Sequence, residues 1–553
     1  MNLTRSAALA TLAGTLSVLA SPPALVLTGQ IGSDLSADGQ TAVGTFWNAA
    51  LGEYVIHTYT RGVGAMSTGS IVDNDPIHCS ADGMAISFNA YDLQNVAGLG
   101  TDRYSPRTWT LAGGETNFGK PPTGTSCDAF TFNANDISGN GRYVVGGGYT
   151  LTTCGTHRAA RLDTLLNVWE ELPVSTSPAP WNAQARATRA DAVSADGTVI
   201  VGYDENYADA SQQQWRGACV WVKNGSTWTQ TILDRYANKV FAVSADGNTL
   251  VGKMSPTTMQ ATFGTSITTP VRWTRSGNSW IAHNMGGEDD MLPTAVSADG
   301  STIVGTGGSD GSFIWRANLN GGVPKSLPQH VADLGGSFPG LYIGSLGGSA
   351  VRAVSADGNT LLISTVDEEN PCLVWSPGAI LCLNGAPCEP ANIVLGPVSH
   401  YNPDGPLAEP YGMTFNCFVA GSWPMTIQWQ QETGPGTGVW TDLVDDNCDE
   451  YLPEFFNFRG TTTMQLRIGG LDGIWSGRYR CVVTNDCGTA ISGTIRAATC
   501  YADYDCNGFV NGDDFDYFVV AFEAGDPVAD IDGDGFVSGI DFDSFADAFI
   551  AGC

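Results

Sequence analysis

The tetrapeptide Ser36-Ala37-Asp38-Gly39 recurs along much of this 553-residue chain and decides its expected fold. Six further copies start 44, 58, 56, 50, 53 and 58 residues after one another, at 80–83, 138–141, 194–197, 244–247, 297–300 and 355–358. The third copy reads Ser-Gly-Asn-Gly and the others keep Ser-Ala-Asp-Gly. A repeat period of about 50 residues indicates that each copy belongs to one structural unit that stacks on its neighbours.

Three further segments follow the tetrapeptide in most copies. A β-branched run ending in Gly comes first, as in Thr198-Val199-Ile200-Val201-Gly202, and a segment ending in Trp comes next, as in Ala218-Cys219-Val220-Trp221. A short apolar segment such as 228–233 often closes the unit. We expect the same place to be held by Trp47, Trp109, Trp273, Trp315 and Trp375, and by Arg161-Leu162 in the third unit.

These segments predict four short strands in each unit. Asp-Gly between two alternating runs favours a tight hairpin turn, because Gly tolerates positive φ and Asp caps the turn. Valine and isoleucine favour strands buried between stacked sheets, and each Trp supplies a large apolar wedge. Four short strands about every 50 residues predict a seven-bladed β-propeller over residues 21–388. We expect residues 24–28 to close the ring by pairing with the last blade, because an open ring would leave two unpaired edges.

The repeat resembles the HAF-type repeats of extracellular bacterial β-propeller proteins. Its turn followed by a strand and a Trp is also similar to a WD40 blade, but the Gly-His and Trp-Asp signatures of WD40 are absent. The resemblance implies a propeller fold, and propellers serve both as enzymes and as binding scaffolds.

The repeats show no catalytic motif, so the catalytic residues stay unknown. An Asp in six of seven turns is explained by turn geometry, and sialidase Asp-boxes have one more residue between Asp and Gly. The run Gly307-Gly308-Ser309-Asp310-Gly311 matches a nucleophile elbow, but it lies between strands in a glycine-rich chain and is discarded. The histidines are scattered and have no zinc-binding spacing.

Residues 389–498 form a second predicted domain. Cys417 is followed by Trp429 after twelve residues and by Cys481 after 64, and Tyr479 stands two residues before Cys481. This pattern resembles the immunoglobulin fold, which implies a Cys417–Cys481 disulfide across the core beside Trp429. Cys448 and Cys487 are a plausible second bridge, although sequence alone does not fix connectivity. The domain serves either as a spacer or as an adhesion module.

The last segment, residues 499–553, carries the clearest chemistry. It contains thirteen acidic residues, has no Lys, Arg or His, and repeats itself at an offset of 27 residues. Each copy places oxygen ligands at the spacing of a calcium loop, with Gly at the sharp turn. The first loop offers Asp503, Asp505, Asn507, the carbonyl of Phe509, Asn511 and Asp514. The second loop offers Asp530, Asp532, Asp534, the carbonyl of Phe536, Ser538 and Asp541.

The two loops, each followed by a helix with phenylalanines on one face, resemble a dockerin of the type that ends in Gly-Cys, here Gly552-Cys553. The last ligand is Asp where an EF-hand has Glu, as in dockerins. The resemblance implies two calcium ions and a cohesin-like partner, or else a surface-retention role. We also expect a Cys500–Cys553 disulfide to clasp the module. A disordered acidic tail, the simpler interpretation, does not explain the phenylalanines or the two in-register loops.

The N-terminus and the charge balance point to the extracellular space. Arg5, the apolar stretch 7–19 and the small residues 18–20 predict a secretory signal peptide over residues 1–20. Fourteen cysteines in an exported chain are then expected to be mostly disulfides. A net charge of -31 argues against nucleic acid and anionic membranes as partners, and no other apolar run is long enough to span a membrane.

Two functions remain open from the sequence. The first is a secreted, non-catalytic binding or adhesion protein, with the propeller as the platform for a glycan or protein ligand and the dockerin-like module as its anchor. The second is an extracellular polysaccharide-degrading enzyme, a glycosidase or lyase, with the propeller as its catalytic unit. The lack of a catalytic motif favours the first.

Overall fold

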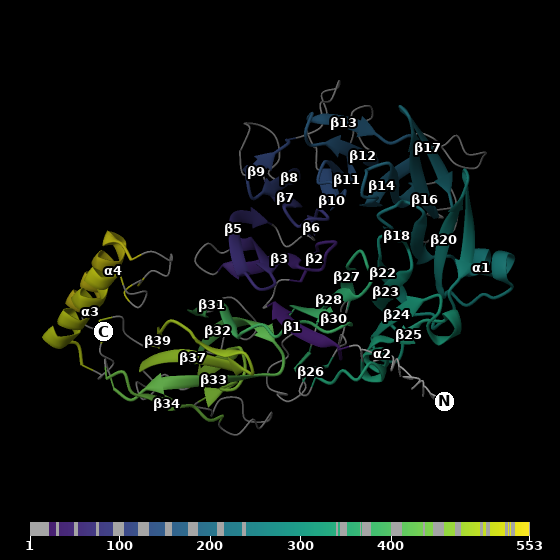
Figure 1. The fold of residues 1–553 in the computed structure, drawn as a ribbon. Coiled ribbons are helices and arrows are strands. Elements are labelled where there is room, and N and C mark those ends of the chain that lie inside the picture. Colours follow the sequence, from purple (N-terminus) through teal and green to yellow (C-terminus); the bar gives the residue numbers. More distant parts are fainter. Residues whose placement is uncertain are drawn as a thin grey trace, which may run out of the picture.

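The structure is a computed structural model of the whole chain, and most of its secondary structure is β (Figure 1). It describes residues 21–28, 32–48, 53–72, 77–91, 104–119, 132–149, 157–174, 186–206, 215–234, 239–338, 341–342, 351–364, 366–367, 378–399, 412–434, 437–445, 458–469, 477–497, 502–504, 509–525, 529, 531 and 537–551. The signal peptide predicted over residues 1–20 lies outside this part. The predicted mostly β fold with four-stranded antiparallel sheets is confirmed.

Six antiparallel sheets follow one another, each with four strands in chain order. The first contains β2 (Asp34–Leu35), β3 (Thr41–Asn48), β4 (Glu53–Thr60) and β5 (Gly64–Val72). The second contains β6 (His78–Cys79), β7 (Ala85–Tyr91), β8 (Tyr104–Thr110) and β9 (Gly114–Asn117). The third contains β10 (Phe132–Ile137), β11 (Tyr143–Tyr149), β12 (His157–Asp163) and β13 (Val168–Glu171).

The next three sheets repeat the same pattern. The fourth contains β14 (Arg186–Val193), β15 (Val199–Asn206), β16 (Trp215–Asn224) and β17 (Thr227–Ile232). The fifth contains β18 (Val240–Val243), β19 (Thr249–Lys253), β20 (Pro270–Ser276) and β21 (Ser279–Asn284), with α1 (Pro256–Phe263) between its second and third strands. The sixth contains β22 (Leu292–Val296), β23 (Thr302–Thr306), β24 (Ser312–Arg316) and β25 (Lys325–Ser326), followed by α2 (Leu327–Asp333).

A longer sheet completes the circle. It begins with β27 (Val351–Val354), β28 (Thr360–Ser364), β30 (Gly378–Cys382) and the N-terminal strand β1 (Ala24–Thr28). Ala24 pairs with Cys382 and Leu27 with Ala379, so the prediction that residues 24–28 pair with the last unit is confirmed. Two short strands, β26 (Leu341–Tyr342) and β29 (Val366–Asp367), pair as a separate two-stranded antiparallel sheet.

The first strands of these sheets form a closed circle. Each contacts the first strand of the next sheet, and β27 contacts β2. The repeated turns are also joined by backbone hydrogen bonds: the N–H of Ala37 donates to Ala81 O at 2.8 Å, and the N–H of Ala356 donates to Ala37 O at 2.6 Å. The turns between them are connected in the same way. We call this closed set of sheets the ring; Figure 1 shows it running from purple through teal to green.

The Ser and Asp of the repeated tetrapeptide serve the turn itself. In the last copy, Ser355 Oγ donates to Asp357 Oδ1 at 2.6 Å and accepts from the N–H of Thr360 at 2.9 Å. The N–H of Asn359 donates to the same carboxylate. The other copies make the equivalent bond between the Ser hydroxyl and the Asp or Asn side chain. These contacts support the structural interpretation of the repeated aspartates.

The turn glycine also lets neighbouring sheets approach. Gly358 has φ +73°, and a Cβ at this position would lie 2.2 Å from Thr302 Oγ1 of the preceding sheet. A Cβ on Gly39 would likewise lie 2.7 Å from Thr360 Cβ, so the first and last sheets approach each other in the same way. The tetrapeptide therefore fixes both the hairpin and the contact between sheets.

In five sheets the large buried residue on the third strand is the one that the sequence predicts, and in two sheets it is a different residue. Trp109, Trp221, Trp273 and Trp315 lie on the third strands and are buried, and Leu162 holds this place in the third sheet. Tyr59, not Trp47, holds it in the first sheet, because β3 extends to Asn48 and keeps Trp47 on the second strand. In the last sheet this position is held by Leu381, which pairs with Leu361, while Trp375 lies outside the described residues.

The second unit consists of two sheets. One continues the ring's last sheet with β31 (Asn392–Ser399), β32 (Gly412–Ser422), β36 (Gln465–Gly469) and β35 (Phe458–Arg459). The other contains β34 (Trp440–Asp442), β33 (Met425–Glu432), β37 (Gly477–Asn485), β38 (Gly488–Ile491) and β39 (Ile495–Ala497).

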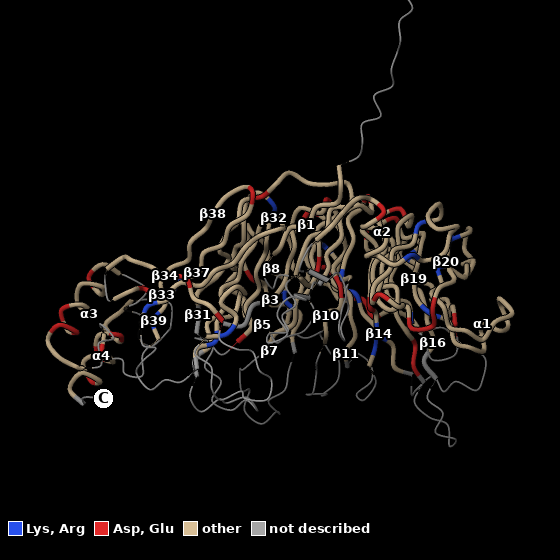
Figure 2. The backbone as a smooth tube through the Cα atoms, turned by 90° about the horizontal axis from the view of Figure 1, so that it is seen from below, with Lys and Arg blue, Asp and Glu red and all other residues tan. Residues whose placement is uncertain are grey.

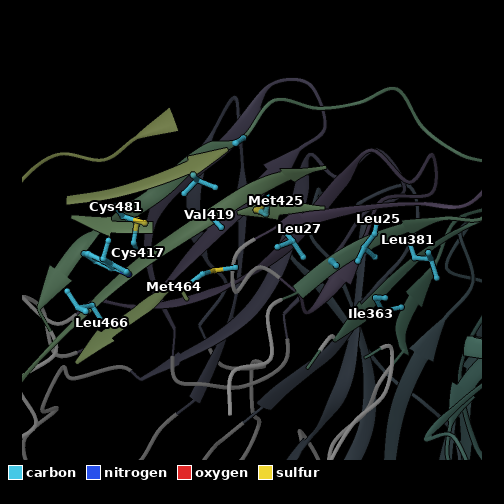
Figure 3. Close-up of a cluster of buried hydrophobic side chains, with 14 of the residues drawn as sticks. Leu25, Leu27, Ile363, Leu381, Cys417, Val419, Met425, Met464, Leu466 and Cys481 are labelled. Carbon is cyan, nitrogen blue, oxygen red and sulfur yellow. The ribbon is translucent and has the colours of Figure 1, made fainter. Parts of the chain in front are cut away.

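The ring and the second unit share strand β1. Its other edge pairs with β32, with Val26 opposite Ser422 and Thr28 opposite Ala420. Apolar side chains follow this shared sheet from Leu381 and Leu25 to Val419 and Leu466 as one buried cluster (Figure 3). The two units are therefore joined by hydrogen bonds and by a common core.

A disulfide links Cys388 to Cys487. Cys388 lies in the segment between the ring and the second unit, and Cys487 lies in the turn just before β38. The Cys448–Cys487 bridge, which is plausible from the sequence, is therefore wrong, because Cys487 is paired with Cys388. Cys388 stands in the short segment between β30 and β31, which passes beside Cys487 because β1 brings the ring against the second unit.

The chain ends in two helices, α3 (Gly512–Ala524) and α4 (Gly539–Ala551), which lie side by side beyond the second unit (Figure 1). We call them the helix pair. Figure 2, in which Asp and Glu positions are red along the backbone, shows red segments on both helices. Within the described residues, no helix is long and apolar enough to cross a membrane.

Candidate functional site

The predicted calcium ligands are partly described. Of the first loop, the structure places Asp503, Phe509, Asn511 and Asp514, and of the second it places Ser538 and Asp541. The remaining predicted ligands, Asp505, Asn507, Asp530, Asp532, Asp534 and Phe536, lie outside the described residues, as do Cys500 and Cys553. In the described part, no group of three or more His, Cys, Asp or Glu side chains is arranged to hold a metal ion.

The last ligand position of each loop has the same environment. Asp514 and Asp541 are both 0% exposed. Asp514 Oδ2 accepts from the N–H of Asn511 at 2.8 Å, and Asp541 Oδ2 accepts from the N–H of Ser538 at 2.7 Å. Asp541 Oδ1 also accepts from the N–H of Ile531 at 2.7 Å. Each carboxylate therefore holds the end of its loop at the first turn of its helix, which also suits the helix dipole.

The helix pair has the symmetry that the duplicated sequence predicts. Phe518 stacks on its counterpart Phe545, with ring centroids 4.0 Å apart and planes 9° apart. Phe515 contacts Phe549 at 6.0 Å, and the counterparts of these two residues, Phe542 and Phe522, contact each other at 5.7 Å. Exchanging the two copies thus maps these contacts between phenylalanines onto one another.

The donor set fits calcium. The predicted positions offer oxygen, from the backbone carbonyls at Phe509 and Phe536 and from side chains elsewhere, and two of the carboxylates are fully buried in a segment without any basic residue. A buried carboxylate is costly unless a positive charge or hydrogen bonds stabilise it. Calcium bound by the two loops would supply that charge.

Cys417 and Cys481 lie together in the core of the second unit. Cys417 comes from β32 and Cys481 from β37, on opposite sheets, and Figure 3 shows the two side chains adjacent to each other. Both are thiols here, and a hydrogen bond with Cys417, together with burial, raises the pKa of Cys481. Trp429 pairs in register with Cys481 and is 0% exposed. The expected disulfide stays a prediction, and the proximity it requires is present.

A second cluster of titratable groups lies inside the ring. Asp34, His78 and Asp136 belong to the first strands of three neighbouring sheets, β2, β6 and β10. His78 Nδ1 lies 3.8 Å from Asp34 Oδ2 and 3.8 Å from Asp136 Oδ1. Asp34 Oδ2 and Asp136 Oδ1 therefore lie no farther apart than twice this distance. Side-chain exposures of 27% for His78, 21% for Asp34 and 19% for Asp136 leave the cluster accessible to solvent.

Both carboxylates also connect neighbouring sheets. Asp34 Oδ2 accepts from the N–H of Cys79 at 2.9 Å, and Asp136 Oδ2 accepts from the N–H of Val193 at 2.8 Å. Burial raises the pKa of Asp136 to about 6, although the neighbouring His78 lowers it. Burial raises the pKa of Asp34 too. A carboxyl with such a pKa can exchange a proton near neutral pH.

Sequence reasoning missed this cluster, although a signal was present. Asp34, His78 and Asp136 each stand two residues before the repeated Ser, where the other four copies have Ala192, Ala242, Ala295 and Ala353. An alignment of the repeats with one another would have placed all three on adjacent inner strands.

The chain matches no known family of proteins and no curated protein. Among solved structures it is similar to oligogalacturonate lyase from Vibrio parahaemolyticus, with 9% identity, 65% of this chain and 91% of that chain covered, and a TM-score of 0.35. It is also similar to the β-propeller domain of the Trilobed protease from Pyrococcus furiosus, with 9% identity, 65% and 97% covered, and a TM-score of 0.38. Likenesses this weak carry no information about activity.

Proposed function

We propose that this chain is a secreted, non-catalytic binding protein. In this proposal the ring is a seven-bladed β-propeller over residues 21–388 and recognises a glycan or protein. Residues 389–498 are an immunoglobulin-like stalk, and residues 499–553 are a dockerin-like module. That module binds two calcium ions and docks onto a cohesin-like or cell-surface component.

The observation that carries this proposal is the strand shared by ring and second unit. Because β1 is hydrogen-bonded to both β30 and β32, the ring is held in a fixed orientation on the second unit. The acidic helix pair follows at the far end of that unit (Figure 1). A platform, a rigid support and a terminal calcium module in this order suit presentation of a binding surface away from its anchor.

The experiment is a retention assay on bacterial cell envelopes with the full chain, with and without a calcium chelator. We expect retention in calcium, loss on chelation, and loss in the D514N/D541N double variant. D543N/D547N is the matched control, because it removes the same charges at exposed positions of α4. If retention is unchanged both by the chelator and by the D514N/D541N substitutions, the anchoring role is contradicted.

The cluster of Asp34, His78 and Asp136 favours a second candidate, the polysaccharide-degrading enzyme. Glycosidases use two carboxyl groups separated by about 5 to 9 Å, one of them with a raised pKa. The separation of Asp34 and Asp136 is compatible with the lower part of that range. Both carboxylates, however, accept hydrogen bonds from backbone N–H groups of the neighbouring sheet. This structural role accounts for the presence of both residues without catalysis.

Release of reducing sugar from plant and bacterial polysaccharides distinguishes the two candidates. The binding proposal expects no release above that of a heat-denatured sample. Release by the full chain that is abolished in D136N but kept in D191N, a neighbouring inner-strand carboxylate, would favour the enzyme.

A further inference from the structure

The second unit contacts the C-terminal segment where the first predicted calcium loop begins. Arg496 Nη2 of β39 donates a hydrogen bond to the backbone carbonyl of Asp503, and the Arg496 guanidinium carbon lies 4.8 Å from the centre of the Tyr504 ring. The guanidinium carbon of Arg478, on β37, lies 5.9 Å from the centre of the same ring. Figure 1 shows β39 on the side of the second unit next to the helix pair.

The two arginines form a pair of like charges. Arg478 and Arg496 stand directly opposite each other in the register of β37 and β39, so both side chains leave the same face of the sheet. Like charges directly opposite each other destabilise a sheet. Arg478 Nε is also buried and has no hydrogen-bond partner within the described residues. This pair therefore weakens the sheet by itself and is better explained by the group that it contacts.

The C-terminal segment has the chemistry that compensates such a pair. Residues 499–553 contain thirteen acidic residues and no basic ones, so they attract guanidinium groups. Tyr504 is fully buried, and both arginines lie within cation–π distance of its ring. The same ring contacts Phe518 at 5.4 Å and Phe545 at 6.0 Å. One aromatic side chain thus connects the two arginines to the stacked phenylalanines of both helices.

The contact also includes a predicted calcium ligand. Asp503 holds the first position of the first loop, where its carboxylate is the expected ligand, and its carbonyl accepts from Arg496. Bound calcium would fix the backbone of this loop, because the ligands must converge on one ion. Without calcium the carboxylates of the loop repel one another. The Asp503 carbonyl and the Tyr504 ring then leave the positions at which the arginines contact them.

We propose that Arg478 and Arg496 form a calcium-dependent dock for the C-terminal module. With calcium bound, the dock holds the module in one direction on the second unit, and removal of calcium releases it from β39. The inference rests on the proposed calcium-binding role of residues 499–553 and adds control over the direction of the anchor. Because such coupling is reciprocal, docking also strengthens calcium binding at the first loop.

Hydrogen exchange of the full chain, in calcium and in chelator, tests the dock. We expect peptides that cover residues 495–504 to exchange at least tenfold faster in chelator, while β33 of the same sheet stays protected. R496A should exchange fast over 495–504 even in calcium. R467A removes an arginine from the other sheet of the second unit and should behave like the unaltered chain. R496K keeps the charge without the planar guanidinium and should lie between R496A and the unaltered chain.

Calorimetric titration with calcium measures the reciprocal effect. We expect two sites in the unaltered chain. R496A should weaken one of them about fivefold and leave the other within twofold, because the dock contacts the first loop. R467A should leave both affinities within twofold. Equal or tighter calcium binding at both sites of R496A would overturn the coupling, since it would mean that the arginine only repels the ion.

The possible results separate the dock from the proposed function. If the chain binds two calcium ions but exchange over 495–504 responds neither to chelator nor to R496A, the dock is wrong and the calcium module stands. If the chain binds no calcium, both are wrong. If fast exchange in β33 shows that R496A unfolds the second unit, R496K and the unaltered chain with and without chelator decide the matter by the same criteria.

Discussion

Arg61 of the ring and Glu389 of the connecting segment form a buried ion pair, with 2.9 Å between Arg61 Nε and Glu389 Oε1. The other carboxylate oxygen accepts from the Tyr59 hydroxyl at 2.9 Å and from the N–H of Gly62 at 3.2 Å. The backbone carbonyl of Glu389 accepts from Asn485 Nδ2 of the second unit at 2.8 Å. One residue therefore connects the first sheet of the ring to the second unit, next to the Cys388–Cys487 disulfide.

We expect E389A to destabilise this junction by about 3 to 5 kcal/mol, because it leaves the buried Arg61 and Tyr59 without their acceptor. Thermal unfolding and limited proteolysis in the 383–391 segment measure the effect. E53Q, at an exposed position of β4, is the control for a lost acidic charge. An E389A variant as stable as E53Q would show that the pair contributes nothing to the junction.

The repeated turn gives a second prediction, which separates backbone strain from contact between sheets. Gly358 and Gly225 both have positive φ, +73° and +61°, but only Gly358 has another sheet within reach of a Cβ. G225A should cost about 1 kcal/mol, the strain of a left-handed alanine. G358A should cost clearly more, because the Thr302 side chain must also move. Equal losses on chemical denaturation would mean that the sheets do not need this close approach.

Much of the ring could be predicted because its information is local. The Ser, Asp and Gly of each turn bond within five residues, so the tetrapeptide alone specifies the hairpin. The wedge position was harder: Tyr59 replaces Trp47 because strand length, which the tetrapeptide does not encode, sets where the third strand begins. The partner of Cys487 depends on how the two units meet, which no short motif records.

The candidate sites also differ in how local in sequence their residues are, and this decides which of them could be predicted. The calcium loops are contiguous in sequence, so their ligands can be read from spacing. The Asp34–His78–Asp136 cluster combines three different sheets, so only a comparison of the repeats with one another would reveal it.

The carboxyl of Asp136 gives a prediction about pH. Its pKa in the folded chain is about 6, above the value of about 4 for an unfolded Asp, so the folded state binds the extra proton between these pH values. Ionisation therefore removes stability as the pH rises from about 4 to 6. D136N resembles the protonated carboxyl, so we expect it to match the unaltered chain near pH 4 and to exceed it by about 1 to 3 kcal/mol at pH 8. Unfolding free energies at the two pH values measure this difference. An advantage for D136N that is the same at both would contradict the raised pKa.

The adjacent thiols of Cys417 and Cys481 predict a disulfide in the oxidised protein. Peptide mapping after secretion should recover this pair together with Cys388–Cys487, which serves as an internal reference. C417A/C481A should then lower the stability by about 2 to 5 kcal/mol relative to the oxidised chain. If mapping finds both cysteines alkylated while Cys388–Cys487 is intact, the pair does not form.

The helix pair gives the last prediction, which concerns calcium. Asp541 is fully buried, closes its loop through the N–H groups of Ile531 and Ser538, and has no basic residue in its own segment. Removing calcium should therefore take away the positive charge that balances this buried carboxylate, and the helix pair should melt at a lower temperature. Calorimetry of the full chain should show one transition that shifts down by several degrees in chelator. In D541N this transition should be low from the start and should respond less to calcium, whereas D547N, at an exposed site on the same helix, should behave like the unaltered chain. A transition in the unaltered chain that does not move when calcium is stripped would contradict a metal-dependent fold.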